Sequence, residues 1–406
     1  MLTYQFGMLS TTAISLLMYL LGVFICRKIK FLKKYYIPAP VVGGLIFAMV
    51  NLVLNVTGIV KFTFDKTIQN VAMSLFFTSV GYMASIKLLK KGGASIVLMV
   101  LVATILIVCQ DLIGVGLCGL LGVDGKVGLL VGSIPFTGGN GTASAWGSVY
   151  AIKYGIAYAD ALGNASATVG LVAGGLLGGP VAKLLYNKKL NGVSNASVVY
   201  QKQQGQEHLL NYAKVLSTVI LLFVCMGISE FLFPYFTKLL HLISPNLNLP
   251  SYILSMIIAM IVRNVQELAL NQKVFALESD KVGDIGLQIF LSISLTTLDL
   301  ISLTTVGVSV VLLLVLAVVV QVAFVALYNY FVTFNVMGKN YDAVVMCAGH
   351  CGFALGATPT AIANMDAFCK INGKSEKAYL TIPLVGAMFI DFVNALIISV
   401  FLGFLA

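Results

Sequence analysis

MGKNYDAVVMCAGHCGFALGATPTAIANM, residues 337–365, is the stretch that decides the fold of this chain. It is too apolar for a surface loop, yet Gly349, Gly352 and Gly356 weaken any helix through its middle. Pro359 removes a backbone donor and disfavours helical geometry at the residue before it. Irregular backbone at membrane depth is tolerated only where it is buried in protein or lines a wet cavity. Since broken segments of this kind hold substrates and ions in transporters, we expect a binding site here.

The composition is that of a polytopic membrane protein. Of the 406 residues, 59% are hydrophobic and 10% are charged, and the mean hydropathy is +0.99. Soluble domains average about 25% charged residues. The net charge of +10 comes from short basic clusters between apolar runs, which indicates cytoplasmic loops rather than a nucleic-acid partner. The seven cysteines form no Cys-x-x-Cys pattern, so we expect small apolar side chains rather than disulfides.

Ten apolar segments are long enough to cross a bilayer, which takes about 20 helical residues. We place them at 8–26, 38–57, 68–86, 95–121 and 162–186, and then at 212–234, 249–262, 285–302, 306–334 and 378–404. Each half also has one broken stretch, 128–151 or 341–365, and a polar linker at 187–211 separates the halves. The pattern predicts an all-α membrane protein with one half at 1–186 and the other at 212–406.

The two halves match one another at a nearly constant offset of 211 to 213 residues. The corresponding pairs are Pro38 with Pro250, Gln110 with Gln321, Gly138 with Gly349, Gly141 with Gly352, and Leu171 with Leu384. Such an offset indicates internal duplication. Because each half has five spans, an odd number, the second half must be inverted in the membrane. We therefore predict two inverted-topology repeats, each carrying a re-entrant loop.

The basic residues set the orientation of the chain. With the N-terminus outside, 20 of the 25 Lys and Arg residues lie in inside loops and 5 lie outside. This distribution places both termini outside and the linker in the cytoplasm. It also makes the two re-entrant loops enter from opposite sides, so that they can meet near the midplane.

The first broken stretch contains TGGNGT, a turn rich in glycine and hydrogen-bonding groups. Glycine lets a ligand approach the backbone, and a helix that begins after the turn points its positive end at an anion. The candidate binding residues here are Thr137, Gly138, Gly139, Asn140, Gly141 and Thr142. In the second stretch they are Gly349, His350, Cys351, Gly352, Gly356, Thr358 and Thr360. Close helix packing through small residues is the alternative, and the matched register favours binding.

Two further polar residues need an explanation. We expect His350 to line the cavity as a hydrogen-bonding side chain, because Cys347 and Cys351 beside it leave no evident fourth ligand for zinc. Asp391 lies deep in the last span with Asn394 three residues further on, on the same helical face. A carboxylate inside the membrane is costly, so we interpret Asp391 as functional; a structural hydrogen bond to a helix break is the alternative. Asp111 also lies in a span, and we give it less weight.

These stretches resemble a known family. FLKKYYIPAPVVGGL, the GGNGT loop, residues 337–365 and PLVGAMFIDFVNAL are similar to the bacterial sodium/glutamate symporter family, and the similarity covers nearly the whole chain. The resemblance implies sodium-coupled glutamate uptake, inverted repeats and paired re-entrant loops with a Gly-Gly-x-Gly motif. Gly138, Gly139 and Gly141 fit the first motif. Gly349 and Gly352 fit the second, with His350 in place of its second glycine.

On this resemblance we expect a multi-pass inner-membrane transporter that imports glutamate with sodium. No catalytic residue, cofactor or metal other than sodium is expected. Because no span carries a mid-membrane Arg or Lys, backbone N–H groups, hydroxyls and helix ends must bind the carboxylates, and Asp391, Asn394 and Asn140 would bind sodium. We also expect a homodimer.

A di- or tricarboxylate carrier of similar architecture is the alternative within transport. An ion channel would repeat one filter sequence, whereas the two loops differ. A hydrolase within the membrane needs a nucleophile and a base, and only His350 of the three histidines lies in a membrane segment.

Overall fold

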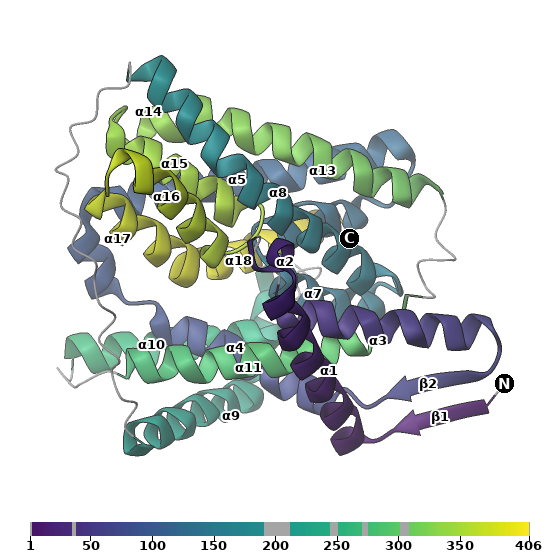
Figure 1. Cartoon of the computed structure of the whole chain (residues 1–406). Helices are drawn as coiled ribbons and strands as arrows, with labels where there is room; N and C mark the ends of the chain where they lie inside the picture. Colours follow the sequence, from purple (N-terminus) through teal and green to yellow (C-terminus); the bar gives the residue numbers. More distant parts are fainter. Residues whose placement is uncertain are drawn as a thin grey trace.

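The computed structural model describes residues 2–34, 38–190, 212–243, 251–269, 275–300 and 308–405, which form two layers of helices (Figure 1). The lower layer of Figure 1 contains β1 (Leu2–Phe6), α1 (Met8–Lys28), α3 (Ala39–Val56), β2 (Val60–Phe64), α4 (Thr67–Met83), α9 (Tyr212–Ile243), α10 (Ser251–Asn264), η2 (Val265–Ala269) and α11 (Ala276–Thr296). Helix α1 rises out of this layer, and α2 (Lys30–Lys34) follows it above the layer. Most of the linker predicted at 187–211, and Pro250, lie outside the described residues.

The upper layer holds both broken stretches. It contains α5 (Ile86–Leu121), η1 (Gly125–Val131), α6 (Ser133–Phe136), α7 (Gly139–Lys153), α8 (Ala159–Lys189), α13 (Val308–Tyr328), η3 (Asn329–Thr333), α14 (Phe334–Val336), α15 (Tyr341–Ala354), α16 (Thr358–Asn372), α17 (Glu376–Leu384), η4 (Val385–Phe389) and α18 (Ile390–Phe404). The predicted breaks are present, since α6 is followed by α7 and α15 by α16.

The chain visits the two layers in the same order twice. Helices α1, α3 and α4 lie in the lower layer and α5 to α8 in the upper, and then α9 to α11 lie in the lower and α13 to α18 in the upper. Each visit to the lower layer supplies three long helices, and each visit to the upper layer supplies a long helix, a broken stretch and a further helix. This is the order that a duplicated chain would have, and the inverted orientation of the halves stays a prediction.

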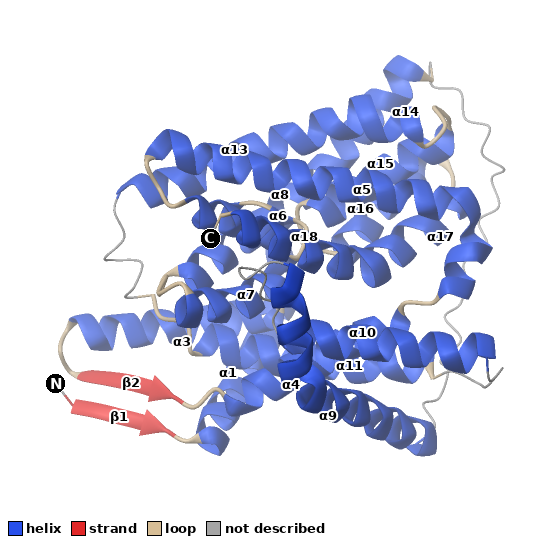
Figure 2. Ribbon diagram, turned by 180° about the vertical axis from the view of Figure 1, so that it is seen from behind, coloured by secondary structure: helices blue, strands red, loops and turns tan. Residues whose placement is uncertain are grey.

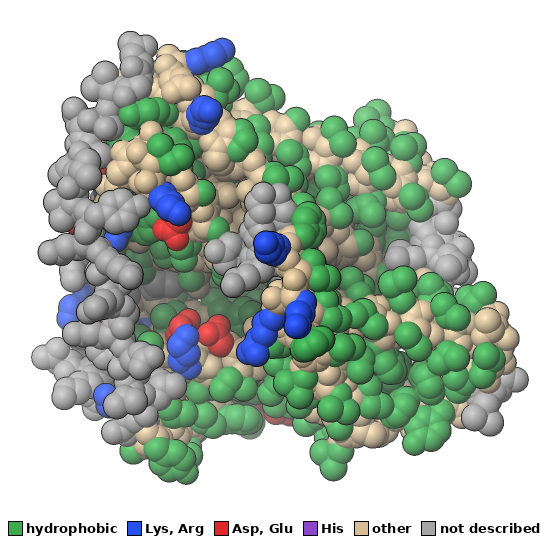
Figure 3. Space-filling view, in the orientation of Figure 1, with side chains coloured by type: hydrophobic (Ala, Val, Ile, Leu, Met, Phe, Trp, Pro, Cys, Tyr) green, Lys and Arg blue, Asp and Glu red, His purple; other side chains and the backbone are tan. Residues whose placement is uncertain are grey.

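The described helices confirm a multi-pass membrane protein. Seven of them are long and apolar enough to cross a membrane, and an eighth span is possible if the pair on either side of the 43° bend near η4 is counted as one. The surface in Figure 3 is accordingly dominated by hydrophobic side chains, and the charged ones gather around the recess between the layers. The count of ten spans stays a prediction.

Helices α4 and α11, which overlap the predicted spans at 68–86 and 285–302, are not among these seven. Helix α4 is 17 residues long, and the first turns of α11 carry Glu278, Asp280, Lys281 and Asp284. The two helices pack against each other, and both line the central cavity. A helix that faces a cavity needs an apolar stripe only where it touches its neighbours, so a polar face is tolerated.

A small sheet departs from the all-α prediction. Strands β1 and β2 pair in parallel, with Leu2 opposite Val60 and Phe6 opposite Phe64, and the rings of Phe6 and Phe64 stack 5.5 Å apart. Parallel strands need a long crossover connection, which α1 and α3 provide here. Figure 2 shows the sheet at the edge of the molecule, away from the broken stretches.

Helix α8 fixes the position of the second broken stretch through a glycine face. A Cβ added at Gly170 would lie 2.4 Å from the carbonyl oxygen of Leu355, and one added at Gly178 would lie 2.3 Å from Nδ2 of Asn364. Contacts this short leave no room for any side chain. The Asn364 amide also donates to the carbonyl of Gly174 at 2.9 Å, so α16 is tied to the same face of α8.

Candidate functional site

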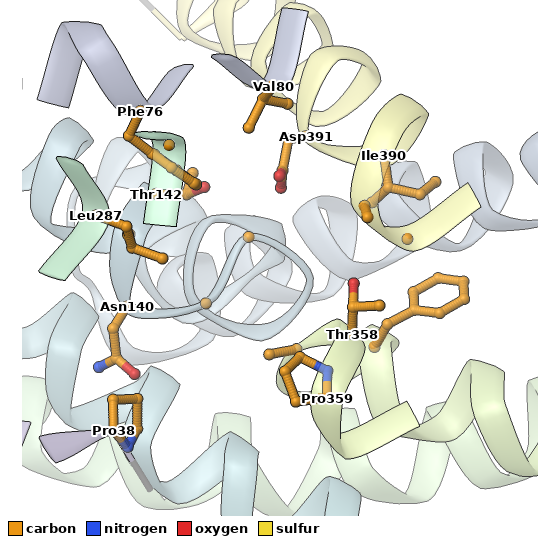
Figure 4. A pocket seen from close by; sticks show the side chains of 18 of the residues that line it. Pro38, Phe76, Val80, Asn140, Thr142, Leu287, Thr358, Pro359, Ile390 and Asp391 are labelled. Carbon is orange, nitrogen blue, oxygen red and sulfur yellow. The ribbon is translucent and has the colours of Figure 1, made fainter. Parts of the chain in front are cut away.

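A cavity of about 450 Å³ lies between the layers, where the two broken stretches meet (Figure 4). The first stretch contributes residues 137–142 to its wall, and the second contributes Phe353 and residues 356–360. Helices α4 and α11 complete the wall with apolar side chains such as Phe76 and Leu287. Nine of the predicted binding residues therefore share one cavity: Thr137, Gly138, Gly139, Asn140, Gly141, Thr142, Gly356, Thr358 and Thr360.

The tips of the two broken stretches touch at Gly139. This residue begins α7 with a φ of +66°, a left-handed conformation that glycine adopts without steric cost. A Cβ added there would lie 2.9 Å from the carbonyl oxygen of Gly356, which is closer than an ordinary contact. Glycine is thus needed at position 139 for two reasons: the turn between α6 and α7 requires a positive φ, and the second stretch approaches too closely for a side chain.

The break in the second stretch lies a few residues before Pro359, the residue from which the sequence predicted it. Helix α15 ends at Ala354, and Ala357, which precedes α16, is extended with φ −160° and ψ 162°. Pro359 lies in the first turn of α16, where its missing N–H costs no hydrogen bond. The break is therefore centred on residues 355–357, and the proline begins the next helix.

Two helices of 15 residues, α7 and α16, begin at the wall of this cavity. The first N–H groups of a helix have no partner within it, and the helix dipole places partial positive charge there. Among the described residues that line the cavity, none is Lys, Arg or His, whereas Asp391, Asp280 and Asp284 are acidic. Lys281 pairs with Asp280 at 3.7 Å and with Asp284 at 3.4 Å. The cavity thus offers helix ends and hydroxyls to an anion, and the carboxylate of Asp391 to a cation.

Comparison with known proteins agrees with this arrangement. The family model of the sodium/glutamate symporter matches residues 4–374. The chain is 40% identical to the sodium/glutamate symporter of Haemophilus influenzae over 405 residues, and 37% identical to that of Escherichia coli over 403 residues; each match covers 98% of both proteins. The chain belongs to the sodium/glutamate symporter family. These relatives are transporters and not enzymes, as the sequence predicted.

In this family member, the predicted sodium ligands Asp391 and Asn394 face different surroundings. Asp391 lines the cavity, and Figure 4 shows its carboxylate pointing into it. Asn394 is fully buried, does not line the cavity, and donates to the carbonyl of Ser133 at 3.2 Å. Asn394 therefore holds the start of α6, which is the structural role weighed above for Asp391.

Four predicted binding residues of the second stretch lie outside the cavity wall: Gly349, His350, Cys351 and Gly352. A Cβ at Gly352 would lie 2.5 Å from Cα of Ala361, and one at Gly349 would lie 2.8 Å from Cγ2 of Ile382. These glycines let α15 pack closely against α16 and α17. They shape the hairpin and do not reach the cavity.

His350 is fully buried beside aromatic rings of the symporter. Its Nδ1 lies 3.1 Å from Oγ1 of Thr333, and its ring lies 4.9 Å from that of Phe353. His350 does not line the cavity, contrary to the prediction. Phe353, three residues further on, lines it instead. Cys351 is likewise buried.

Gln110, which the sequence analysis used only as a marker of the repeat, joins both breaks. Its Oε1 accepts from Oγ1 of Thr137 at 2.6 Å, and its Nε2 donates to the carbonyl of Ala354 at 2.9 Å. Gln321, its counterpart in the second half, donates to the backbone carbonyl of Gln110 at 2.8 Å. The two glutamines thus meet at the centre of the upper layer.

Asp111 supports the first break from beside Gln110. Its carboxylate accepts from the backbone N–H of Ser133 at 2.8 Å and from the Ser133 hydroxyl at 3.0 Å. Together with Asn394 it fixes the first residue of α6. The signal in the sequence that points to this role is the polar pair Gln110–Asp111 inside a long apolar run.

Proposed function

We propose that this protein imports glutamate together with sodium, and that the cavity between the two broken stretches binds both. The observation that supports this most strongly is that α7 and α16 begin at one cavity, whose wall has no basic residue in the part of the chain that the structure describes. Glutamate carries two carboxylates, and two helix N-termini can bind one each. Membership of the family supplies the identity of substrate and ion.

The start of each helix would hold one carboxylate of glutamate. At α7 the available groups are the backbone N–H groups after Gly138 and the hydroxyl of Thr142; at α16 they are the backbone near Thr358 and the hydroxyl of Thr360. The Thr360 hydroxyl is buried and has no hydrogen-bond partner among the described residues, as expected of a group kept for a ligand.

Sodium would bind on the Asp391 side of the cavity. A hard cation prefers oxygen ligands, and the carboxylate of Asp391 can combine with carbonyls from the breaks, such as that of Gly356. Asn140 is a candidate ligand from the first stretch. Asn394 does not line the cavity, and its amide nitrogen donates to the carbonyl of Ser133, so the cavity itself supports Asp391 and Asn140 as ligands. Bound sodium would also reduce the repulsion between Asp391 and the anionic substrate.

The inverted repeats, the inner-membrane location with both termini outside, and the homodimer belong to the same proposal. The repeated order of layers supports the duplication, and the excess of 20 over 5 basic residues supports the orientation. The homodimer rests on the family resemblance.

Uptake by purified protein in liposomes tests the function. An inward sodium gradient should drive accumulation of labelled glutamate, and an equal potassium gradient should not. Unlabelled citrate and succinate, added in excess, should leave uptake within twofold. If citrate or succinate inhibits the uptake as strongly as unlabelled glutamate does, the protein is a di- or tricarboxylate carrier instead.

A further inference from the structure

We propose that Asp160 and Asn164, which lie outside the cavity wall, are positioning residues that aim the amide oxygen of Asn140 at a bound cation. The inference rests on the proposed function only in taking the cavity as the binding site. It assigns a task to two polar residues at the start of α8 that the site described above does not use.

The orientation begins at Asp160, whose carboxylate can only accept hydrogen bonds when it is ionised. Nδ2 of Asn164 donates to Oδ1 of Asp160 at 2.7 Å and to the Asp160 carbonyl at 2.9 Å. The same nitrogen lies 2.9 Å from the hydroxyl of Ser144. Because Asp160 offers two acceptors at this point, the nitrogen of the Asn164 amide must face it, and the Asn164 oxygen must face the other way.

The other end of the Asn164 side chain orients Asn140 in the same manner. Nδ2 of Asn140 lies 3.1 Å from Oδ1 of Asn164, 3.4 Å from the Asn164 carbonyl and 3.3 Å from the hydroxyl of Thr168. The Thr168 hydroxyl is itself engaged as a donor to the Asn164 carbonyl at 2.8 Å, which leaves its lone pairs for Asn140. All three neighbours therefore accept, and the nitrogen of the Asn140 amide is held among them.

Oδ1 of Asn140 is the one atom of these two amides that this arrangement leaves without a hydrogen bond among the described residues. Asn140 lines the cavity beside Pro38 (Figure 4), yet its side-chain oxygen is buried and has no hydrogen-bond partner among the described residues. Only 5% of the residue is exposed. An unpaired buried acceptor is unfavourable, and because Asn140 lines the cavity, a bound ligand can supply the missing partner. An acceptor-only atom cannot bind a carboxylate, so its ligand must carry a donor or a positive charge.

Two cations in the transport reaction fit this acceptor, namely the ammonium group of glutamate and the sodium ion. Both require an oxygen and not a nitrogen from Asn140. The competing explanation is that Asp160 merely complements the dipole at the start of α8. That role would affect folding and would leave the binding of substrate and ion unchanged.

Asp160→Asn tests the proposal because it keeps the shape and removes the acceptor-only character. An asparagine at position 160 can turn its amide so that the nitrogen donates to Asn164. The amide of Asn164 can then flip and present its nitrogen to Asn140, so the oxygen of Asn140 is no longer held in one orientation. The matched control is Asp65→Asn. Asp65 is a surface residue that accepts from the backbone N–H of Thr67 at 2.8 Å, which asparagine can also do. Each protein is reconstituted, and uptake is titrated with glutamate at saturating sodium and with sodium at saturating glutamate.

We expect Asp160→Asn to raise the half-saturating concentration of either glutamate or sodium at least tenfold. Asp65→Asn should change neither concentration. A rise for glutamate alone identifies the ammonium group as the cation, and a rise for sodium alone identifies the ion. Asn140→Asp added to Asp160→Asn should recover most of the loss, since an aspartate presents an oxygen to the cavity whichever way it turns. If Asp160→Asn folds poorly, Thr168→Val should show the same shift at a smaller size.

Unchanged half-saturation in both titrations, with only a lower maximal rate, would overturn the proposal and assign Asp160 to folding. The same conclusion follows if Asn140→Asp gives no recovery. Failure of the function itself is recognised separately, because the unmodified protein would then show no sodium-dependent glutamate uptake.

Discussion

Gly139→Ala probes the contact between the two broken stretches most sharply. The variant places a methyl group 2.9 Å from the carbonyl oxygen of Gly356, and ordinary contacts begin at 3.4 Å. The tips must therefore separate by about 0.5 Å, which moves the start of α7 relative to that of α16. Misplacing groups that act together by about 1 Å can cost about a hundredfold in rate, so we expect about a tenfold loss of uptake.

The variant also forces alanine into a left-handed conformation, and this cost must be separated from the contact. For an L-residue the cost is about 1–2 kcal/mol. Gly155 provides a matched control, because its φ is +68° and an added Cβ would have no neighbour within 4 Å. Gly155→Ala should lower stability by about the same amount, again about 1–2 kcal/mol, and leave uptake per folded protein unchanged.

The assay is sodium-driven uptake of labelled glutamate in liposomes, normalised to the amount of monodisperse protein recovered after reconstitution. Thermal unfolding in detergent reports stability alongside. Equal uptake per folded protein for Gly139→Ala and Gly155→Ala would refute the reasoning, because the approach of the two tips would then have no part in transport.

Other substitutions separate binding from packing. Gly352→Val, whose side chain would overlap Ala361 on α16, should abolish uptake in a membrane-inserted protein, and normal uptake would mean that the hairpin tolerates opening. His350→Leu should lower thermal stability by about 1 kcal/mol through the lost hydrogen bond to Thr333 and leave half-saturating glutamate unchanged, whereas a large rise in that concentration would return His350 to the binding site. Asp391→Asn should raise the sodium concentration for half-maximal uptake about tenfold, corresponding to about 1.4 kcal/mol of ion binding, and an unchanged midpoint would remove Asp391 from the ion site. A cysteine at position 194 should react only with reagent on the cytoplasmic side, and labelling in intact cells would contradict the inverted topology.

The breaks could be predicted from the sequence because their cause is local. Glycine at positions 138 and 139 and proline at position 359 act on the backbone of their own segments, and both breaks lie within a few residues of these positions. The membrane class was also accessible, because it depends on composition alone. Membership of the family followed from the matching stretches.

Which side chains face the cavity could not be predicted, because that depends on the packing of neighbouring helices. Residues 343–354 of α15 are all buried, so burial does not distinguish Phe353, which lines the cavity, from His350, which lies behind it. Asp391 and Asn394, three residues apart on α18, differ because Ser133 of the other half lies beside Asn394. The sequence predicted spans at 68–86 and 285–302 but not that α4 and α11 line the cavity, because that also depends on which helices pack against them.

The central claim is that the two tips form a single site for glutamate and sodium, and substrate protection tests it most directly. Cysteines are introduced singly at Thr142 and Thr358, in a background without the native cysteines, and the rate of thiol modification is measured with and without glutamate and sodium. Both residues line the same cavity, one at the start of each helix. We expect glutamate to slow modification at both positions, and only when sodium is present. Protection at one position alone, or equal protection in potassium, would contradict a shared sodium-coupled site.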